Sequence, residues 1–278
     1  MTFLIKAVVY AVAFMPRWLR WMLVKVSTSL AHKSYQTAKR QIQAVYQISD
    51  RMPFLNSFIW QIFFLRLEML HELCCYLVKP DYITIDDNGF GEYLKSTKSG
   101  VVVITAHIGS WELLAKVCHK SIVQRFYILA KPSKSRLGQK VLKAFRTLFS
   151  YQILWTDDSA LKLKILDSLN SGCAVGFAMD QKPQRGGVLV NLLDRPTKVV
   201  EGPAKLARMT QAQVVAVYCI RLKKRSYEMI WHPIDTQNCS LEEATQKMAD
   251  SMSFVIKLYP EQWCWEYKRW SKDELQLV

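Results

Sequence analysis

The chain has 278 residues, half of them hydrophobic, so it can bury a large core and is not disordered. Lysine and arginine outnumber aspartate and glutamate by 38 to 23. The formal net charge of +15 favours anionic partners, which include phospholipid surfaces, phosphorylated glycolipids, acidic carrier proteins and nucleic acid. Nucleic acid is the class we exclude, because the sequence has no zinc-finger spacing, no RRM signature and no detached basic tail.

The aromatic residues and the cysteines indicate where in the cell the protein works. Nine Trp, 12 Tyr and 12 Phe are interleaved with the basic residues, a combination that suits a membrane interface. The seven cysteines form no CxxC pair and no zinc-ligand spacing, and their odd number fits reduced thiols in the cytosol. We therefore expect neither a disulfide nor a metal site.

The amino-terminal segment is hydrophobic, but charges and a proline interrupt it before about 20 apolar residues accumulate. These residues are Lys6, Pro16, Arg17, Arg20 and Lys25. A spanning helix and a cleaved signal peptide are both disfavoured, and the segment is interpreted as an uncleaved anchor. Apolar residues at 18, 19 and 21–23 beside Arg17, Arg20 and Lys25 predict an interfacial helix that places cations near lipid phosphates. The alternative is a helix that packs on the protein's own core.

The rest of the chain predicts an α/β fold with a mostly parallel central sheet and helices on both faces. A long apolar helix over 54–79 closes an N-terminal helical, membrane-associating region, residues 1–79, and Pro80 ends it. In the α/β domain, residues 80–278, strands and helices alternate. The predicted strands are 82–85, 101–105, 126–130, 173–179, 188–193, 214–220 and 227–231. The predicted helices are 91–97, a basic one at 135–149, one capped by Asp157 or Asp158 that runs to 169, one at 202–210, and one that runs to 259 after a capping box of Ser240 and Glu243.

The segment VVVITAHIGSWELL, residues 101–114, is the strongest indication of chemistry. A β-branched strand ends at Thr105, His107 follows it, Gly109 and Ser110 form a turn, and Glu112 lies in the first turn of the next helix. On one helix, five residues would rotate about 500° and leave His107 and Glu112 on different faces. The two side chains can meet only if His107 lies in the loop.

Polar residues also follow neighbouring strands, where ligands bind in sheets of this class. Lys131 follows one strand, and Asp180, Gln181, Lys182 and Arg185 follow another. The lysine, the arginine and the basic helix could contact acceptor phosphates or an acidic carrier protein.

These motifs together resemble the bacterial lipid A late acyltransferases, within the lysophospholipid acyltransferase superfamily, whose mark is a histidine, four residues and an acidic residue. The segments that carry the resemblance are AHIGSWELL, Arg146, MDQ at 179–181, RGGVLVNLLDRPTKVVEGPAKLAR at 185–208 and PEQWCWEYKRW near the end. The resemblance implies that His107 is the general base and Glu112 its acidic partner. It also implies that Arg146 and Asp180 act around the active site, although such a buried pair could instead hold the sheet edge.

The reaction implied is O-acyl transfer from a carrier-protein thioester to a hydroxyl of lipid A. A positioned imidazole accelerates such an attack by about 100 to 10,000-fold. No bound cofactor is expected, because the thioester is carried on the 4'-phosphopantetheine of an acidic acyl or aminoacyl carrier protein. The oxyanion donors could be Arg146 or backbone amides. The expected location is the cytoplasmic face of the bacterial inner membrane.

Three positions depart from the family pattern and leave the acyl group open. Ser110 stands where asparagine is common, Tyr267 where histidine is common, and residues 129–131 lack the basic tripeptide. A divergent branch transfers glycine to lipid A, a modification linked to antimicrobial peptide resistance, and the chain could belong to it. The rival from another class is a nonenzymatic membrane or lipid-binding protein, since anchoring and phosphate binding need no base.

Overall fold

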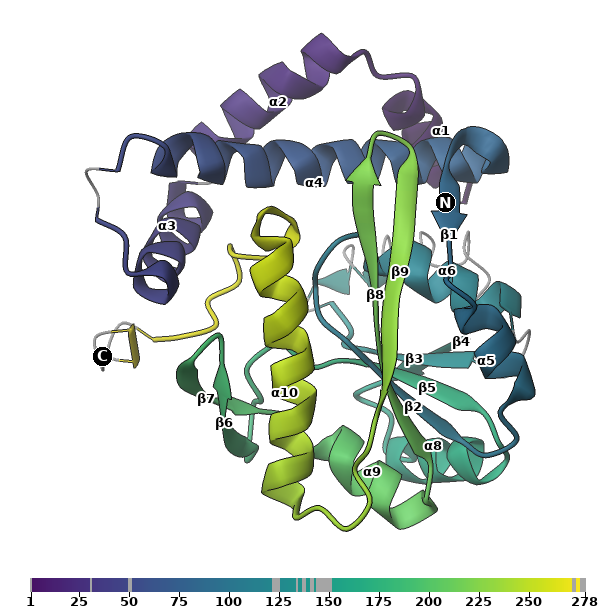
Figure 1. Cartoon of the computed structure of the whole chain (residues 1–278). Helices are drawn as coiled ribbons and strands as arrows, with labels where there is room; N and C mark the ends of the chain where they lie inside the picture. Colours follow the sequence, from purple (N-terminus) through teal and green to yellow (C-terminus); the bar gives the residue numbers. More distant parts are fainter. Residues whose placement is uncertain are drawn as a thin grey trace.

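A seven-stranded sheet forms the centre of the molecule, as the computed structural model in Figure 1 shows. The structure describes residues 2–30, 32–49, 52–121, 126–133, 135–136, 139–140, 143, 152–271 and 274–275. The strands run in the order β1-β9-β8-β2-β5-β3-β4, and every neighbouring pair is parallel except β8 and β9. Their bounds are Thr84–Asp86 (β1), Val101–Thr105 (β2), Phe126–Ala130 (β3), Gln152–Trp155 (β4), Ala174–Ala178 (β5), Gln213–Lys223 (β8) and Ser226–Ile234 (β9). The predicted mostly parallel sheet is confirmed.

Helices cover both faces of this sheet because alternate residues of its strands are buried on opposite sides. Val102 and Ile104 of β2 belong to one core cluster, with residues of α8 (Leu161–Asn170), α9 (Gly202–Thr210) and α10 (Leu241–Leu258). Val101 and Val103 belong to a second cluster, with α5 (Phe90–Ser96) and α6 (Trp111–Ser121). A separate antiparallel hairpin, β6 (Val188–Leu192) and β7 (Arg195–Val199), packs against α10.

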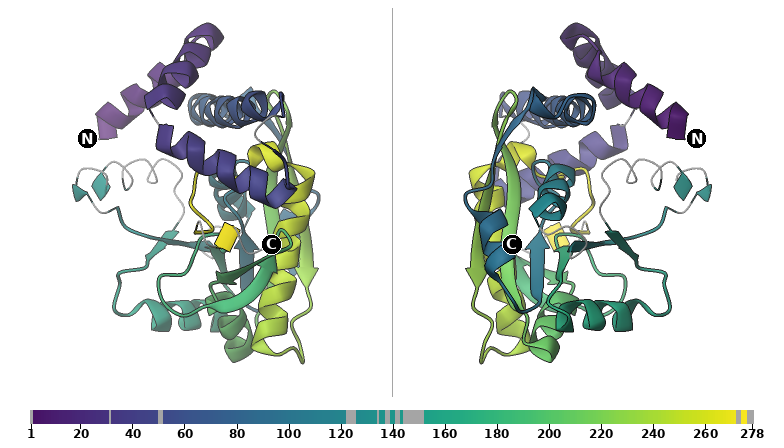
Figure 2. Two further views of the ribbon diagram at one scale, coloured as in Figure 1. Left: turned by 90° about the vertical axis from the view of Figure 1, so that its left-hand side faces the viewer. Right: turned by 90° about the vertical axis from the view of Figure 1, so that its right-hand side faces the viewer.

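Four helices precede the sheet. They are α1 (Thr2–Ala13), α2 (Arg17–Leu30), α3 (His32–Tyr46) and α4 (Leu55–Val78). The long α4 lies across one end of the sheet, and α1 and α2 lie on its outer side, projecting away from the body (Figures 1 and 2). On its inner side α4 contacts the single-turn helices η1 (Pro80–Tyr82) and η2 (Pro260–Gln262).

Among the described residues, no single helix is long and apolar enough to cross a membrane. Residues 5–13 and 17–26 would pass that test together, but they are bent by 110°.

Most of the predicted elements form within two residues of their expected bounds. The strands over 101–105 and 126–130 and the helix over 202–210 have the expected limits. The capping box also forms, since Ser240 accepts from the backbone of Glu243 and the Glu243 carboxylate accepts from that of Ser240. The strand predicted from residue 82 begins instead at Thr84, because Pro80 starts a 3₁₀ turn. The basic helix of 135–149 lies mostly outside the described residues.

Candidate active site

Two adjacent parallel strands place His107 beside Asp180. Thr105 at the end of β2 pairs with Ala178 at the end of β5, so the residues two positions further on leave the sheet at the same level. The amide of Met179 still donates to the carbonyl of Thr105 at 2.9 Å, which keeps the two chains together beyond the strands. The expected position of His107, in the loop between strand and helix, is confirmed.

The Asp180 carboxylate accepts hydrogen bonds from three donors. Nδ1 of His107 lies 2.7 Å from Oδ1, the backbone amide of His107 donates to Oδ2 at 3.0 Å, and Nε1 of Trp263 donates to Oδ2 at 2.9 Å. The Asp180 side chain is only 4% exposed, whereas the His107 side chain is 24% exposed. The carboxylate is therefore enclosed while the imidazole keeps an open side.

His107 and Asp180 each shift the pKa of the other. Burial lowers the pKa of His107, but the charge and hydrogen bond of Asp180 raise it above its ordinary value. The charge of Arg66 opposes this rise, and the charge of Glu112 adds a smaller one. Burial opposes ionisation of Asp180, yet the charge of His107 and the hydrogen bonds from His107 and Trp263 hold the pKa of this carboxyl below its usual range. With Nδ1 protonated toward Asp180, the neutral ring presents a lone pair at Nε2.

The turn that carries His107 is fixed by backbone contacts to β8 and to the segment after α10. Gly109 donates to the carbonyl of Gln262 at 3.1 Å, and the amide of Cys264 donates to the carbonyl of His107 at 3.0 Å. Gly109 has a φ of +59°, and a Cβ there would lie 2.0 Å from the carbonyl oxygen of Cys219. Only glycine satisfies both constraints.

A small cavity lies beside this turn. It has a volume of about 260 Å³ and is lined by Arg66, Met69, Leu70 and Leu73 of α4 and by residues 109–112. Glu112 is thus at the wall of the cavity, in the first turn of α6, and acts on His107 through its charge. The direct partner of the imidazole Nδ1 is Asp180. The role of Glu112 as acidic partner stays a prediction.

The remaining predicted site residues occupy different surroundings. Nε2 of Gln181 lies 3.5 Å from Nε2 of His107, at the open side of the ring. Lys182 pairs with Glu274 at 2.8 Å, and its backbone amide donates to the hydroxyl of Tyr267 at 3.1 Å, so Tyr267 contacts the loop after β5. Arg185 is exposed on this loop. Arg146 lies outside the described residues.

Two site residues were missed by the sequence reasoning. Trp263 holds Asp180, and Arg66 of α4 lies 5.9 Å from the ring of Trp111 and forms an ion pair with Glu266. Trp111 in turn packs edge-on against His107, with 5.3 Å between ring centroids. The signal for Arg66 was available, because it is a lone cation in an otherwise apolar stretch of the long helix. Among the described residues, no group of three His, Cys, Asp or Glu side chains could hold a metal ion.

Comparison with known proteins identifies the family of the chain. The family model described as bacterial lipid A biosynthesis acyltransferase matches residues 84–272, which include the whole sheet and both members of the His107–Asp180 pair. A phosphatidylinositol mannoside acyltransferase of Mycolicibacterium smegmatis is 24% identical over 176 residues, covering 63% of this chain and 58% of that protein. A protein of the same description from Mycobacterium tuberculosis (strain H37Rv) is 23% identical over 179 residues, covering 63% and 55%.

The chain spans somewhat more than half the length of these curated relatives. The family match, in contrast, covers most of this chain, from β1 to the segment after Trp270. The chain therefore belongs to the bacterial lipid A biosynthesis acyltransferase family.

Proposed function

We propose that the protein transfers an acyl group from a carrier-protein thioester to a hydroxyl of a glycolipid, with His107 as general base. The observation that carries the proposal is the 2.7 Å hydrogen bond from Nδ1 of His107 to the enclosed carboxylate of Asp180. A buried carboxylate at Nδ1 fixes the tautomer of an imidazole and stabilises its protonated form, as in hydrolytic triads. Here Asp180 takes the part that Glu112 was expected to take.

The transfer step needs no nucleophile from the enzyme, because the acceptor hydroxyl attacks the thioester directly. The acceptor hydroxyl gives its proton to Nε2 of His107 as its oxygen attacks the thioester carbonyl. The tetrahedral intermediate then breaks its C–S bond, and the imidazolium returns the proton to the leaving thiolate. Arg66, which lines the cavity and also pairs with Glu266, is the proposed electrostatic support for the developing oxyanion.

The cavity beside the turn is proposed to receive the acyl group. Its α4 wall is apolar, with Met69, Leu70 and Leu73, which favours an aliphatic chain. Glu112 adds a carboxylate at the opposite wall, where the ammonium of an aminoacyl group such as glycyl could pair. The candidate donors are therefore a fatty acyl thioester and a glycyl thioester.

The proposed partners follow from the family and the charge. Lipid A is the first candidate acceptor because of the family match, and phosphatidylinositol mannoside is the second because the curated relatives carry that name. The donor is proposed to be the 4'-phosphopantetheine thioester of an acidic carrier protein, which the net charge of +15 would attract. The proposed location is the cytoplasmic face of the bacterial inner membrane.

The test of the base is substitution. His107→Ala should lower the rate of transfer by about 100 to 10,000-fold, because it removes the proton acceptor. His232→Ala is the control, because this histidine is half-buried on β9 and lies outside the site. Circular dichroism of both variants checks the fold. Full transfer by a folded His107→Ala protein would refute the proposal and favour a nonenzymatic lipid-binding protein.

A second experiment identifies the substrates. Purified protein is offered acyl-carrier and glycyl-carrier thioesters, each with lipid A or phosphatidylinositol mannoside as acceptor. Mass spectrometry of lipid A from cells with and without the protein measures the mass of the transferred group. A mass increment on lipid A supports the proposed acceptor, whereas transfer only to the mannoside would replace it.

A further inference from the structure

The α2 helix exposes large apolar side chains and buries a charged one, which is unusual for a helix on the surface of a water-soluble protein. Its inner side, against α4, includes Arg20, which is 4% exposed and donates from Nε to the buried Glu68 at 2.6 Å. Its outer side exposes large apolar residues, namely Trp18 (63%), Trp21 (47%), Met22, Leu23 and Val26. Arg20 was expected to face lipid phosphates, and the structure corrects this, because its charge is neutralised by Glu68.

Exposed apolar side chains also precede α2. The helix α1 buries Ile5 and Val9 and exposes Phe3, Val8 and Tyr10, and Phe14, directly after this helix, is exposed as well. Both helices, which project from the body (Figure 2), thus expose large apolar side chains. An exposed apolar surface of this kind needs a covering partner.

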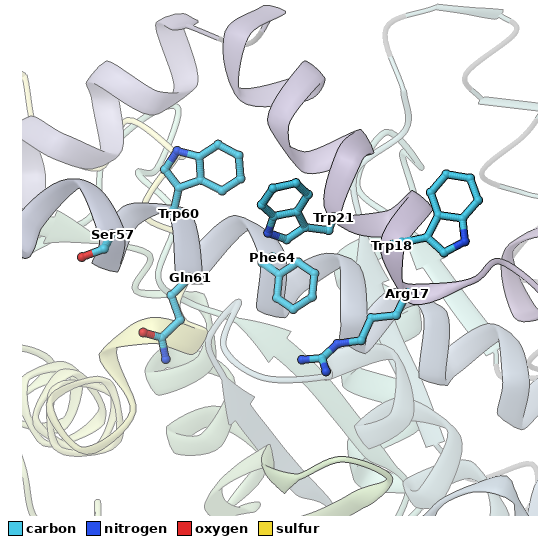
Figure 3. A pocket seen from close by; sticks show the side chains of 7 residues that line it. All are labelled: Arg17, Trp18, Trp21, Ser57, Trp60, Gln61 and Phe64. Carbon is cyan, nitrogen blue, oxygen red and sulfur yellow. The ribbon is translucent and has the colours of Figure 1, made fainter.

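A pocket opens between α2 and α4 next to this surface. Figure 3 shows Arg17 and Trp21 of α2 beside Phe64 of α4, with Trp60 of α4 at one end of the pocket and Trp18 at the other. Its volume is about 570 Å³, and Ser57 and Gln61 complete the lining. The pocket thus combines aromatic walls with a few polar groups, as sites for amphiphilic ligands do.

The pocket has a cation, Arg17, in its wall, and the segment that forms α1 and α2 is rich in cations. Residues 2–30 contain Lys6, Arg17, Arg20 and Lys25 and no aspartate or glutamate. The guanidinium of Arg17 lies 5.8 Å from the ring centroid of Phe64, and no carboxylate of a described residue forms an ion pair with it. Lys25 lies 3.5 Å from the ring centroid of Trp21.

We propose that this pocket binds one anionic phospholipid, with its phosphate at Arg17 and an acyl chain along the indoles of Trp21 and Trp60. The α1–α2 pair then lies in the membrane interface without crossing the bilayer. At 12 residues, α1 is about 18 Å long, shorter than the bilayer core of about 30 Å. Tryptophan is the residue type that membrane interfaces favour, and cations beside it select anionic headgroups. This inference extends the proposed membrane location to a defined lipid class and site, and it does not depend on the transfer chemistry.

The experiment compares sedimentation of the full chain with vesicles. Vesicles of phosphatidylethanolamine and phosphatidylglycerol should bind the protein, and vesicles of phosphatidylcholine alone should bind it weakly. Arg17→Gln should reduce binding to the anionic vesicles about fivefold. Trp18→Ala combined with Trp21→Ala should reduce binding to the anionic vesicles at least about tenfold, because this variant lacks the indole area that the membrane would bury. The controls are Lys162→Gln and Phe254→Ala, which remove an exposed cation and an exposed aromatic ring elsewhere.

A soluble lipid separates the pocket from general adsorption to a surface. Dihexanoylphosphatidylglycerol, below its micelle concentration, should bind one molecule per chain in calorimetry, and Trp60→Ala should abolish this binding. Inorganic phosphate at the same concentration should not bind. Equal binding of wild type and the double tryptophan variant, equal binding to both vesicle types, or short-chain binding that survives Trp60→Ala would overturn the proposal. His107→Ala should bind both vesicle types as the wild type does, which separates this test from that of transfer.

Discussion

Asp180 sets both the orientation and the charge of His107. Because its carboxylate raises the pKa of the imidazole, the neutral ring becomes abundant at higher pH than it would for an unperturbed histidine. The acidic limb of the transfer rate is therefore expected above about pH 6.5, the unperturbed histidine value. A lower midpoint would mean that the pair does not control the rate.

The prediction for Asp180→Asn concerns rate and pH together. Without the negative charge, the pKa of His107 falls, so the acidic limb of the kcat profile should move to lower pH. The plateau rate should fall by about 100 to 10,000-fold, because an amide stabilises neither the imidazolium nor its tautomer. A pH series of transfer rates with saturating donor measures both quantities.

Trp263→Phe is the matched control for this prediction. It removes one of the three donors to Asp180 and keeps the charge. Its acidic limb should stay closer to that of the wild type than the limb of Asp180→Asn. If the asparagine variant kept the wild-type profile, the carboxylate would be only structural.

At the scale of elements, Glu72 joins α4 to the hairpin of β8 and β9. Its carboxylate, 1% exposed, accepts from Nε and Nη2 of Arg221 at 2.9 and 2.7 Å, from the hydroxyl of Tyr227 at 2.7 Å and from the amide of Arg225 at 3.1 Å. Burial opposes its ionisation, but the bonds from Arg221 and Tyr227 hold its pKa below the usual glutamate value. This contact fixes α4, and with it one wall of the cavity, over the sheet.

Glu72→Gln should therefore lower the free energy of unfolding by about 3 kcal/mol, because it leaves the guanidinium of Arg221 without its counter-charge. A carboxyl with a lowered folded-state pKa contributes stability above its unfolded pKa and loses it as pH falls through the folded one. The difference between wild type and variant should shrink in acid. Urea unfolding at two pH values measures it.

Glu92→Gln serves as the control for Glu72→Gln. Glu92 pairs with Lys95 at the surface, where its side chain is 79% exposed, and such pairs contribute little. Equal changes in the free energy of unfolding in the two variants would show that the buried contacts of Glu72 stabilise the protein no more than a surface ion pair does.

The elements were more predictable than their arrangement. The β-branched strand over 101–105 and the capping box at Ser240 are local signals, and both elements formed as expected. The strand β7 was missed, because RPTKV contains a proline and alternates without a strong apolar run. The pairing of β2 with β5 joins positions more than 70 residues apart, and no local pattern encodes that register.

The site was predicted incompletely because the strand register that assembles it is not encoded in any local pattern. His107 was identified from its own segment, and Asp180 was expected around the active site but not as the hydrogen-bond partner of His107. The contact between them depends on the strand register and on Trp263, which arrives from the end of the chain. Glu112 was favoured because it is near in sequence, whereas the partner of Nδ1 is near only in space.

At the scale of the whole molecule, the charge of +15 predicts a salt-dependent encounter with anionic substrates. The Michaelis constant for the acidic carrier thioester should rise as ionic strength increases through about 0.1 to 0.5 M, where the screening length falls below about 10 Å. The turnover number should change less, because His107 and Asp180 interact at short range inside the protein. A Michaelis constant that does not change with salt would count against electrostatic steering.

The backbone at Gly109 has a consequence for reading natural variation in this family. The carbonyl of Cys219 occupies the space that any side chain at 109 would need. A homologue could therefore retain the histidine and both acids and still be inactive, since replacing this one glycine would displace the whole turn. A comparison of the catalytic residues alone would classify such a homologue as active, whereas the residue at position 109 would identify it as inactive.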